Sequence, residues 1–375
     1  MTRLRTAESV CAGHPDKLCD FISDSVLDEC LRLDPLAHVA CECMAARSTI
    51  IVAGEILCAH LSKLDVEAIV KEALRKVGYD PGAFMIQNLL HHQSADIADA
   101  VSDGGAGDQG TVYGYATNET PECLPLPLVL AHRICEALDA MHEVIPSLLP
   151  DGKAQVTLEY DFGKAIRVKT VVVSAQHKAK LSQKELREIV LYDVLLAAFH
   201  NSPLYFDDTT EILVNPSGRF VIGGPEGDSG LTGRKLMVDT YGGFAPHGGG
   251  AFSGKDPSKV DRSGAYMARY IAKNIVAAKL ADRCDVAISY AIGVAEPVAV
   301  DIDTHCTGVF DDEQLSAAVR RVFDLRPAAI IEGLGLRAPI YAPTACYGHF
   351  GRSEFPWERP DRVAQLLDAV KGARA

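Results

Sequence analysis

The stretch HPDKLCDFISDSVLDECLRL (residues 14–33), followed by VACECM (39–44) and STIIVAGEIL (48–57), decides the fold. Apolar residues in the first run recur at helical spacing, so this run predicts one long amphipathic helix. The two later runs are rich in the residues that favour strands, and they predict a strand pair. A second helix is expected from Asp65 to Val77, with Gly78 in the usual position just past its end.

The same order of elements returns further along the chain. Paired strands are expected at VTLEYD (156–161) and IRVKTVVVSAQ (166–176), because apolar and polar residues alternate in both runs. Ser182 and Glu185 form a capping box for a helix through Phe199. The other expected elements are helices near 126–142, from Pro257 to Ala278 with Asp256 as N-cap, and over 312–323, and strands at EILVN (211–215), RFVIGG (219–224), AISYAIGV (287–294) and PVAVDIDTH (297–305).

Strand pairs that alternate with single helices about three times predict an α+β fold of three structurally similar domains, with helices packed on sheet faces. A chain of 375 residues usually divides into domains. We place an N-terminal domain at 1–98, a central domain at 99–222 and a C-terminal domain at 223–375, and we expect the domains to interleave. The polar, glycine-rich stretch at about 91–110 is expected to be a mobile lid at the start of the central domain.

Composition and charge exclude several classes of protein. The net charge of −13 argues against broad affinity for nucleic acid or anionic membranes, because both need surplus Lys and Arg. No apolar run approaches the roughly 20 residues of a membrane helix, and the N-terminus lacks the apolar stretch of a secretory signal. We therefore expect a cytoplasmic protein. Its eleven cysteines are expected to be reduced, buried thiols, because no spacing gives the paired C-x-x-C units of a structural zinc site.

The segment GGPEGDSGLTGRKLMVDTYGGFAPHGGGAFSGKDPSKVD (223–261) carries the strongest chemical signal. Eleven of the chain's 31 glycines lie between Gly223 and Gly254, a density that favours close backbone approach to a ligand over core packing. The interleaved cations and exposed backbone N–H groups suit a polyphosphate, and the interleaved aspartates suit Mg²⁺. The alternative is a solvated, flexible loop.

Two motif matches are weak. GGAFSGKD (249–256) fits the P-loop pattern, but Asp256 stands where that loop needs a hydroxyl for Mg²⁺. GAGDQG (105–110) fits the dinucleotide fingerprint, yet polar residues precede it and no amphipathic helix follows it. Neither match is interpreted as a nucleotide site of its class.

GHPDK (13–17) is a second candidate site at the start of the first helix. His14 could donate to a leaving oxygen and Asp16 could bind a metal ion, although a helix cap explains both residues equally well. Glu42 and Glu55 lie on apolar strand-like runs, where burying a carboxylate is costly unless a cation or donor faces it. An edge-strand position would also account for these two glutamates.

Together, GHPDK, GAGDQG, RFVIGGPEGDSGLTGRK (219–235), the run from DTYGG to KVD (239–261) and CYGHFGR (346–352) strongly resemble the methionine adenosyltransferase family. The resemblance runs from about residue 6 to 368. It implies three domains around a pseudo-threefold axis, and ATP and L-methionine as substrates. It also implies a homodimer or homotetramer with sites at the dimer interface, and Mg²⁺, two per site, with K⁺ as cofactors.

The resemblance assigns roles to individual residues. Catalytic roles would fall to His14, Asp228, Arg234 and Lys255. ATP would be bound by His14, Lys17, Asp108, Lys164, Arg219, Phe220, Arg234, Lys235, Ala251 and Lys255. Methionine would be bound by Glu55, Gln93, Asp228 and Lys259. Asp16 and Asp261 would bind Mg²⁺, and Glu42 would bind K⁺.

Three positions depart from the family pattern. Phe162-Gly163-Lys164 stands where the family commonly shows D-G-K in the middle domain. Ala95 replaces a proline in the lid, which should free the lid backbone and affect closure more than chemistry. His92 stands where a lysine is usual, so one positive charge is expected to be missing at pH 7.

The reaction implied by the resemblance is in-line attack of the methionine sulfur on C5′ of ATP. The whole triphosphate leaves and is then hydrolysed to phosphate and diphosphate. Such a reaction needs positioning and cations more than it needs a base. The alternatives are an ATP-dependent phosphotransferase or NTPase, which would release ADP, and a noncatalytic nucleotide-binding subunit.

Overall fold

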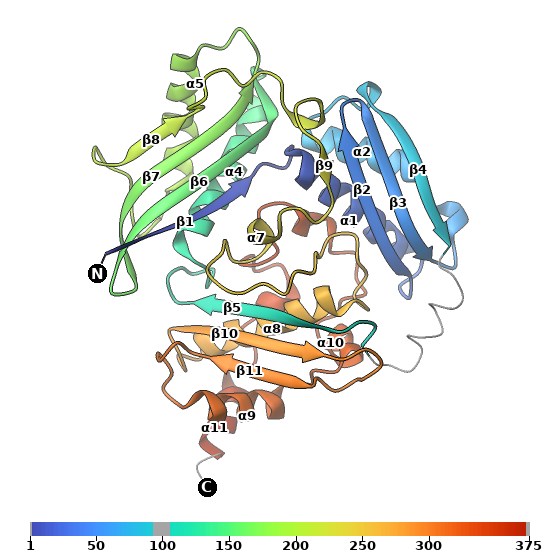
Figure 1. Cartoon of the computed structure of the whole chain (residues 1–375), viewed down its shortest axis with the longest axis vertical. Coiled ribbons are helices and arrows are strands. Elements are labelled where there is room, and N and C mark those ends of the chain that lie inside the picture. The colour runs from blue at the N-terminus through green and yellow to red at the C-terminus, as the bar shows by residue number, and fades with distance from the viewer. Residues whose placement is uncertain (1, 93–105, 373–375) are drawn as a thin grey trace.

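The computed structural model describes residues 2–92 and 106–372, whose strands form three sheets around a central region of loops (Figure 1). Helices pack against each sheet, so every sheet buries an apolar face. The α+β class expected from the sequence is confirmed.

The N-terminal sheet has the strand order β4-β3-β2-β9. Its strands are β2 (His38–Ala46), β3 (Thr49–Leu57), β4 (Met85–His92) and β9 (Gly230–Leu231). β2 runs antiparallel to β3 and β9, whereas β4 runs parallel to β3. Helix α1 (Pro15–Leu33) packs on β2, and α2 (Val66–Val77) packs on α1. As expected, α2 ends at Gly78, whose φ of 98° is the left-handed conformation that glycine adopts readily.

The central sheet has the order β1-β6-β7-β8. Its strands are β1 (Arg3–Val10), β6 (Leu148–Asp161), β7 (Lys164–His177) and β8 (Glu211–Val214). Its helices are α4 (Leu126–Val144), α5 (Gln183–Ile189), the π-helical turn η3 (Val190–Leu195) and α6 (Leu196–Ala198). The capping box of Ser182 and Glu185 is confirmed at the start of α5.

The C-terminal sheet has the order β11-β10-β5, all antiparallel. Its strands are β5 (Gly110–Thr117), β10 (Arg283–Tyr290) and β11 (Ala299–Asp303). Its helices are α8 (Val260–Ala277), α9 (Asp312–Val322), α10 (Pro327–Gly333) and α11 (Val363–Gly372). The short turns are α7 (Leu236–Asp239) and the 3₁₀ turns η1 (Leu61–Lys63), η2 (Pro81–Ala83), η4 (Gly224–Glu226), η5 (Ala342–Ala345) and η6 (Pro356–Glu358).

One edge strand of each sheet comes from a different part of the chain. β1 precedes α1 but pairs with β6, where Val10 lies opposite Lys153. β5 precedes α4 but pairs with β10, and β9 precedes α8 but pairs with β2, where Leu231 lies opposite Met44. We call each sheet together with its helices a unit. The N-terminal unit therefore donates β1 to the central sheet, the central unit donates β5 to the C-terminal sheet, and the C-terminal unit donates β9 to the N-terminal sheet, which closes a cycle (Figure 1).

The hydrophobic core of the described residues has two parts. One cluster runs from α1 to α8 and includes Leu18, Ile22 and Tyr266. The other lies under the central sheet and includes Val156 and Phe199. The first cluster spans the N- and C-terminal sheets, so these two units share one packed interior.

Two local expectations were wrong. Residues 219–224 do not form a strand, because Phe220 bonds through its carbonyl to the amide of His177 instead of entering a ladder. Helix α8 begins at Val260, and Asp256 is not its cap. The Asp256 carboxylate instead accepts hydrogen bonds from the Val39 amide at 2.7 Å and the Ser258 amide at 2.8 Å, which fastens the loop to β2.

Candidate active site

His14 lies in the turn between β1 and α1, as the N-cap of that helix. Its Nδ1 accepts a hydrogen bond from the Asp16 amide at 3.2 Å, so the proton of a neutral ring sits on Nε2. Burial, followed by the nearby charges of Lys235 and Lys153, lowers the pKa of His14 to about 3. His14 is therefore a neutral imidazole at pH 7 that offers one N–H donor.

Asp16 is the centre of the first charged cluster. Its carboxylate accepts the Leu231 amide at 3.0 Å and the Lys235 Nζ at 2.5 Å, and the Arg234 guanidinium lies 3.8 Å away. Burial alone would raise the pKa of Asp16, but the hydrogen bonds from Lys235 and Leu231 outweigh it and hold that pKa below its usual value. The cluster combines one ionised carboxylate with two cations.

Lys17 points into the protein. Its ammonium is fully buried between the carboxylates of Asp20, at 2.8 Å, and Asp239. Although burial disfavours the charged form, these two aspartates raise the pKa of Lys17. The family resemblance implies that Lys17 neutralises the triphosphate of ATP, whereas its charge lies in a buried network behind the loop.

Lys255 and Asp261 form the second charged pair, with Nζ of Lys255 donating to Oδ2 of Asp261 at 2.7 Å. Asp261 lies in the first turn of α8, where the positive end of the helix favours a carboxylate. Glu42 projects from β2 nearby. Burial raises the pKa of Glu42, and the negative charge of Glu55 raises it further. The positive charge of Lys255 lowers that pKa, without cancelling the effect of burial. Lys255 is thus close to two carboxylates, those of Asp261 and Glu42.

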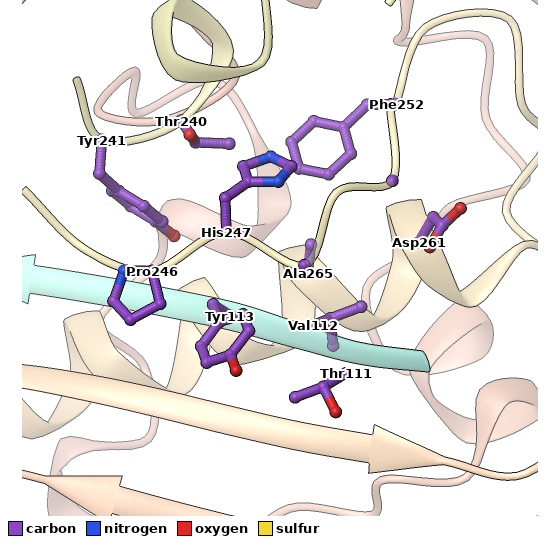
Figure 2. A pocket seen from close by; sticks show the side chains of 12 residues that line it. Thr111, Val112, Tyr113, Thr240, Tyr241, Pro246, His247, Phe252, Asp261 and Ala265 are labelled. Atoms are coloured by element: carbon purple, nitrogen blue, oxygen red, sulfur yellow. The ribbon is translucent and has the colours of Figure 1, made fainter. Parts of the chain in front are cut away.

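A small pocket lies beside Asp261, between β5 and the loop that carries His247 and Phe252 (Figure 2). The two rings face one another with their centroids 6.2 Å apart. The pocket's volume of about 10 Å³ is far below the ~300–1,000 Å³ of typical ligand pockets. This pocket alone does not enclose a nucleotide.

Part of the glycine density serves the protein's own packing. A Cβ on Gly230 would lie 2.1 Å from the Pro15 carbonyl oxygen, and one on Gly254 would lie 1.9 Å from that of Cys41. A Cβ on Gly250 would lie 2.2 Å from the Asp261 carboxyl carbon. Because these glycines have no side chain, the loop lies directly on α1, β2 and Asp261. The sequence predicted instead that this close backbone approach would serve a ligand.

The remaining predicted residues are more scattered. Asp108, Arg219 and Asp228 are exposed, and Phe220 and Ala251 are half-buried. The Lys259 ammonium pairs with the buried carboxylate of Asp256. Glu55 lies on the outward face of β3, with its carboxylate 3.8 Å from the His91 imidazole. Gln93 and Ala95, with most of the expected lid, lie outside the described residues, and His92 is exposed at the end of β4.

Lys164 lies far from the charged clusters. Lys164 is exposed at the β6–β7 turn, next to Phe162. The turn that carries His14 follows Val10, at the opposite end of this sheet. In the register of β1 and β6, Tyr160 pairs with Arg3 and Lys153 pairs with Val10. At about 3.3 Å per residue, these ends of the sheet are separated by roughly 23 Å. The family's D-G-K motif, expected at residues 162–164, would therefore fall at this distant end.

Asp151-Gly152-Lys153 also spells D-G-K, at the near end of the sheet, and was not among the expected site residues. The Asp151 carboxylate accepts the Gly224 amide at 2.8 Å, and its other oxygen has no partner among the described residues. Lys153 lies close enough to lower the pKa of His14. The D-G-K pattern of residues 151–153 is visible in the sequence and could have identified these residues.

Comparison with known proteins gives a consistent result along the chain. Models of the N-terminal, central and C-terminal domains of S-adenosylmethionine synthetase match residues 2–103, 103–220 and 222–359. The S-adenosylmethionine synthase of Treponema denticola is 49% identical over 98% of both chains. That of Roseiflexus castenholzii is 49% identical over 97% of this chain and 96% of the relative.

The fold and these matches define an α+β transferase of three related domains. The chain belongs to the S-adenosylmethionine synthetase family, and its function is that of a methionine adenosyltransferase. Within residues 2–92 and 106–372, no helix has the length and apolar character to cross a bilayer.

Proposed function

We propose that this site forms S-adenosylmethionine by in-line attack of the methionine sulfur on C5′ of ATP, with release of triphosphate and its later hydrolysis to phosphate and diphosphate. The observation that carries the proposal is the cluster of Arg234 and Lys235 on Asp16 beside a neutral His14 donor, together with the Lys255–Asp261 pair. Cations and one N–H donor match the charge that develops on a departing triphosphate.

The chemistry needs no general base, because a thioether sulfur is a neutral nucleophile. His14 can donate from Nε2 to the leaving oxygen without itself changing charge. Arg234 and Lys255 would balance charge on the phosphates. The exposed carboxylate of Asp228 or that of Asp108 would stabilise the sulfonium that forms.

Lys153 is a further phosphate or nucleotide contact in this proposal. It lies on β6 opposite Val10, at the end of β1 that leads to His14. Asp151, beside it, has a buried oxygen with no partner among the described residues, which suits a ligand donor such as a ribose hydroxyl. The pair replaces the distant Lys164 in the proposed site.

Two Mg²⁺ ions per site fit the donor set of Asp16 and Asp261. Mg²⁺ is usually held by one or two carboxylates together with substrate phosphates, not by an all-protein cage. Among the described residues, no group of three or more His, Cys, Asp or Glu could hold a metal ion. Bound Mg²⁺ would neutralise triphosphate charge. Glu42, with Glu55 nearby, would hold K⁺ on the same sheet face.

We propose a homodimer or homotetramer with sites at the dimer interface. The outward face of the N-terminal sheet exposes apolar side chains, which are Met44, Leu57, Met85, Leu89 and Leu231, each 38–58% exposed. An apolar patch of this kind marks an interaction surface. Glu42 and Glu55 lie on the same face, so a second copy docked there would cover the proposed K⁺ and methionine residues. Glu55, Gln93, Asp228 and Lys259 are the proposed methionine contacts.

A cytoplasmic location is proposed from the cysteines. Eight of the eleven are buried free thiols, which are typical of proteins in a reducing compartment. ATP and L-methionine, the proposed substrates, are available there.

The test is phosphate release from ATP and Mg²⁺, with and without methionine, combined with mass detection of the sulfonium product. We expect release to depend on methionine, with no ADP formed. Lys255→Met should lower kcat by roughly 10²-fold or more, by analogy with loss of one charge-stabilising donor. Lys180→Met, which changes an exposed lysine, is the control. Methionine-independent release of ADP would instead indicate an NTPase, and wild-type kcat in folded Lys255→Met would refute the role of Lys255.

A further inference from the structure

Four aspartates form a stripe along α1. Asp16, Asp20, Asp24 and Asp28 follow one another at a spacing of four residues, which places them on one face of the helix. All four residues are buried, with at most 3% of any residue exposed. Buried carboxylates are costly unless donors surround them, and each of these four meets donors from a segment distant in sequence.

Asp20 holds the segment that carries the first cations. Its Oδ1 accepts the Gly233 amide at 2.8 Å, and its Oδ2 accepts the Lys17 ammonium at 2.8 Å. Gly233 directly precedes Arg234 and Lys235 in the chain. The carboxylate of Asp20 therefore fixes the backbone from which both cations extend.

Asp24 holds the segment that carries Lys255 and Asp261. Its Oδ1 accepts the Gly254 amide at 2.8 Å, immediately before Lys255. Its two oxygens also receive the Arg262 guanidinium at 2.7 and 2.9 Å, immediately after Asp261. Arg262 in addition donates to the Lys255 carbonyl at 3.1 Å. Asp24 thus binds Gly254, the residue before Lys255, and Arg262, the residue after Asp261.

Asp28 serves a segment that contributes no proposed substrate or metal contact and that meets Arg262 through Thr344 at 3.1 Å. Its two oxygens accept the amides of Tyr341 and Ala342, each at 2.9 Å. No residue of that segment is among those proposed to bind substrate or metal. Asp28 therefore offers a matched comparison on the same helix, with the same residue type and similar burial.

We propose that Asp20, Asp24 and Arg262 are positioning residues for the transfer reaction. One helix then sets the spacing between the Arg234-Lys235 pair and the Lys255-Asp261 pair. Successive aspartates lie about 6 Å apart along the helix axis, so the two segments are fixed one turn from each other. This inference rests on the proposed roles of those four residues at the triphosphate. Fixing the positions of these residues affects the rate of the reaction, because a misplacement of about 1 Å in such a site can lower the rate roughly 10²-fold.

The first experiment compares Asp20→Asn with Asp28→Asn in the full-length enzyme, at saturating ATP, methionine and Mg²⁺. Asp20→Asn keeps the shape but replaces one acceptor oxygen with an NH₂ donor, so the side chain can no longer accept from both the Gly233 amide and Lys17. Lys17 stays paired with Asp239, so the variant should fold. We expect kcat to fall about 10- to 100-fold, with the KM for methionine changed less than about threefold. Asp28→Asn should lower the melting temperature while kcat stays within about twofold of wild type. A purely structural role for the stripe would move the melting temperatures of both variants and neither kcat.

The second probe is Arg262→Lys, because Asp24→Asn would leave a buried guanidinium without its counter-charge and endanger folding. Lysine keeps the charge but loses the two-pronged geometry, so kcat should fall while the fold survives. Equal kcat values for Asp20→Asn, Arg262→Lys and Asp28→Asn, with Lys255→Met inactive, would overturn the positioning role and leave the proposed function standing. Full activity of Lys255→Met would instead remove the basis of both.

Discussion

Lys153 and Lys164 stand at opposite ends of the same strand pair, which makes them a natural test at the scale of single residues. Lys153→Met should reduce kcat/KM for ATP by about tenfold or more, because it removes a cation beside His14. Lys164→Met should leave it within about twofold of wild type, since Lys164 is exposed at the distant turn. Steady-state kinetics of both variants decide the matter. A larger loss in Lys164→Met would restore the assignment made from sequence.

The sequence predicted some residue environments and missed others. His14 and Asp16 were placed together because neighbours in GHPDK must be close at a helix start. The burial of Lys17 could not be predicted, because one of its two partners, Asp239, is 222 residues away in the chain. The aspartate stripe was visible as a spacing of four, but its meaning depends on amides that only the folded loop brings near.

The loop on α1 and β2 gives a prediction at the scale of elements. Gly254 has a φ of 80°, and a Cβ there would lie 1.9 Å from the Cys41 carbonyl oxygen. Gly254→Ala should therefore push the loop away from β2 and lower the melting temperature strongly. Gly249→Ala is the control, because its φ of 92° carries the same backbone strain of about 1–2 kcal/mol while nothing lies within 4 Å of the added carbon. Similar melting temperatures for the two variants would contradict the close contact.

Most helices and long strands followed from periodicity, including α1, β2, β3 and the capping box of α5. The expected elements did not include β1, β4, β5, α10 or α11. Residues 219–224 have the composition of a strand, yet the Phe220 carbonyl accepts the amide of His177 at the end of β7 without forming a ladder. β9 has only two residues, too few for any pattern. Strand pairing is decided by tertiary neighbours, so local propensity alone does not determine it.

At the scale of the whole molecule, the cycle of donated strands predicts cooperative unfolding. Removing one unit takes an edge strand from another sheet, as β1 is taken from β6 when the N-terminal unit opens. We expect a single calorimetric transition, and we expect a fragment of residues 103–222 to show no cooperative unfolding alone. Separate transitions for the three units, or a stable isolated central fragment, would show that the donated strands contribute little.

The order in which the chain is synthesised makes β9 important for the nascent protein. β2 and β3 leave the exit tunnel early, but the strand that closes the β2 edge ends at Leu231. At ~5–20 residues per second, the nascent sheet waits on the order of ten seconds with that edge open. An unpaired edge invites pairing with other chains. The period of synthesis before β9 emerges is therefore when we expect this protein to be most prone to aggregate and to depend most on chaperones.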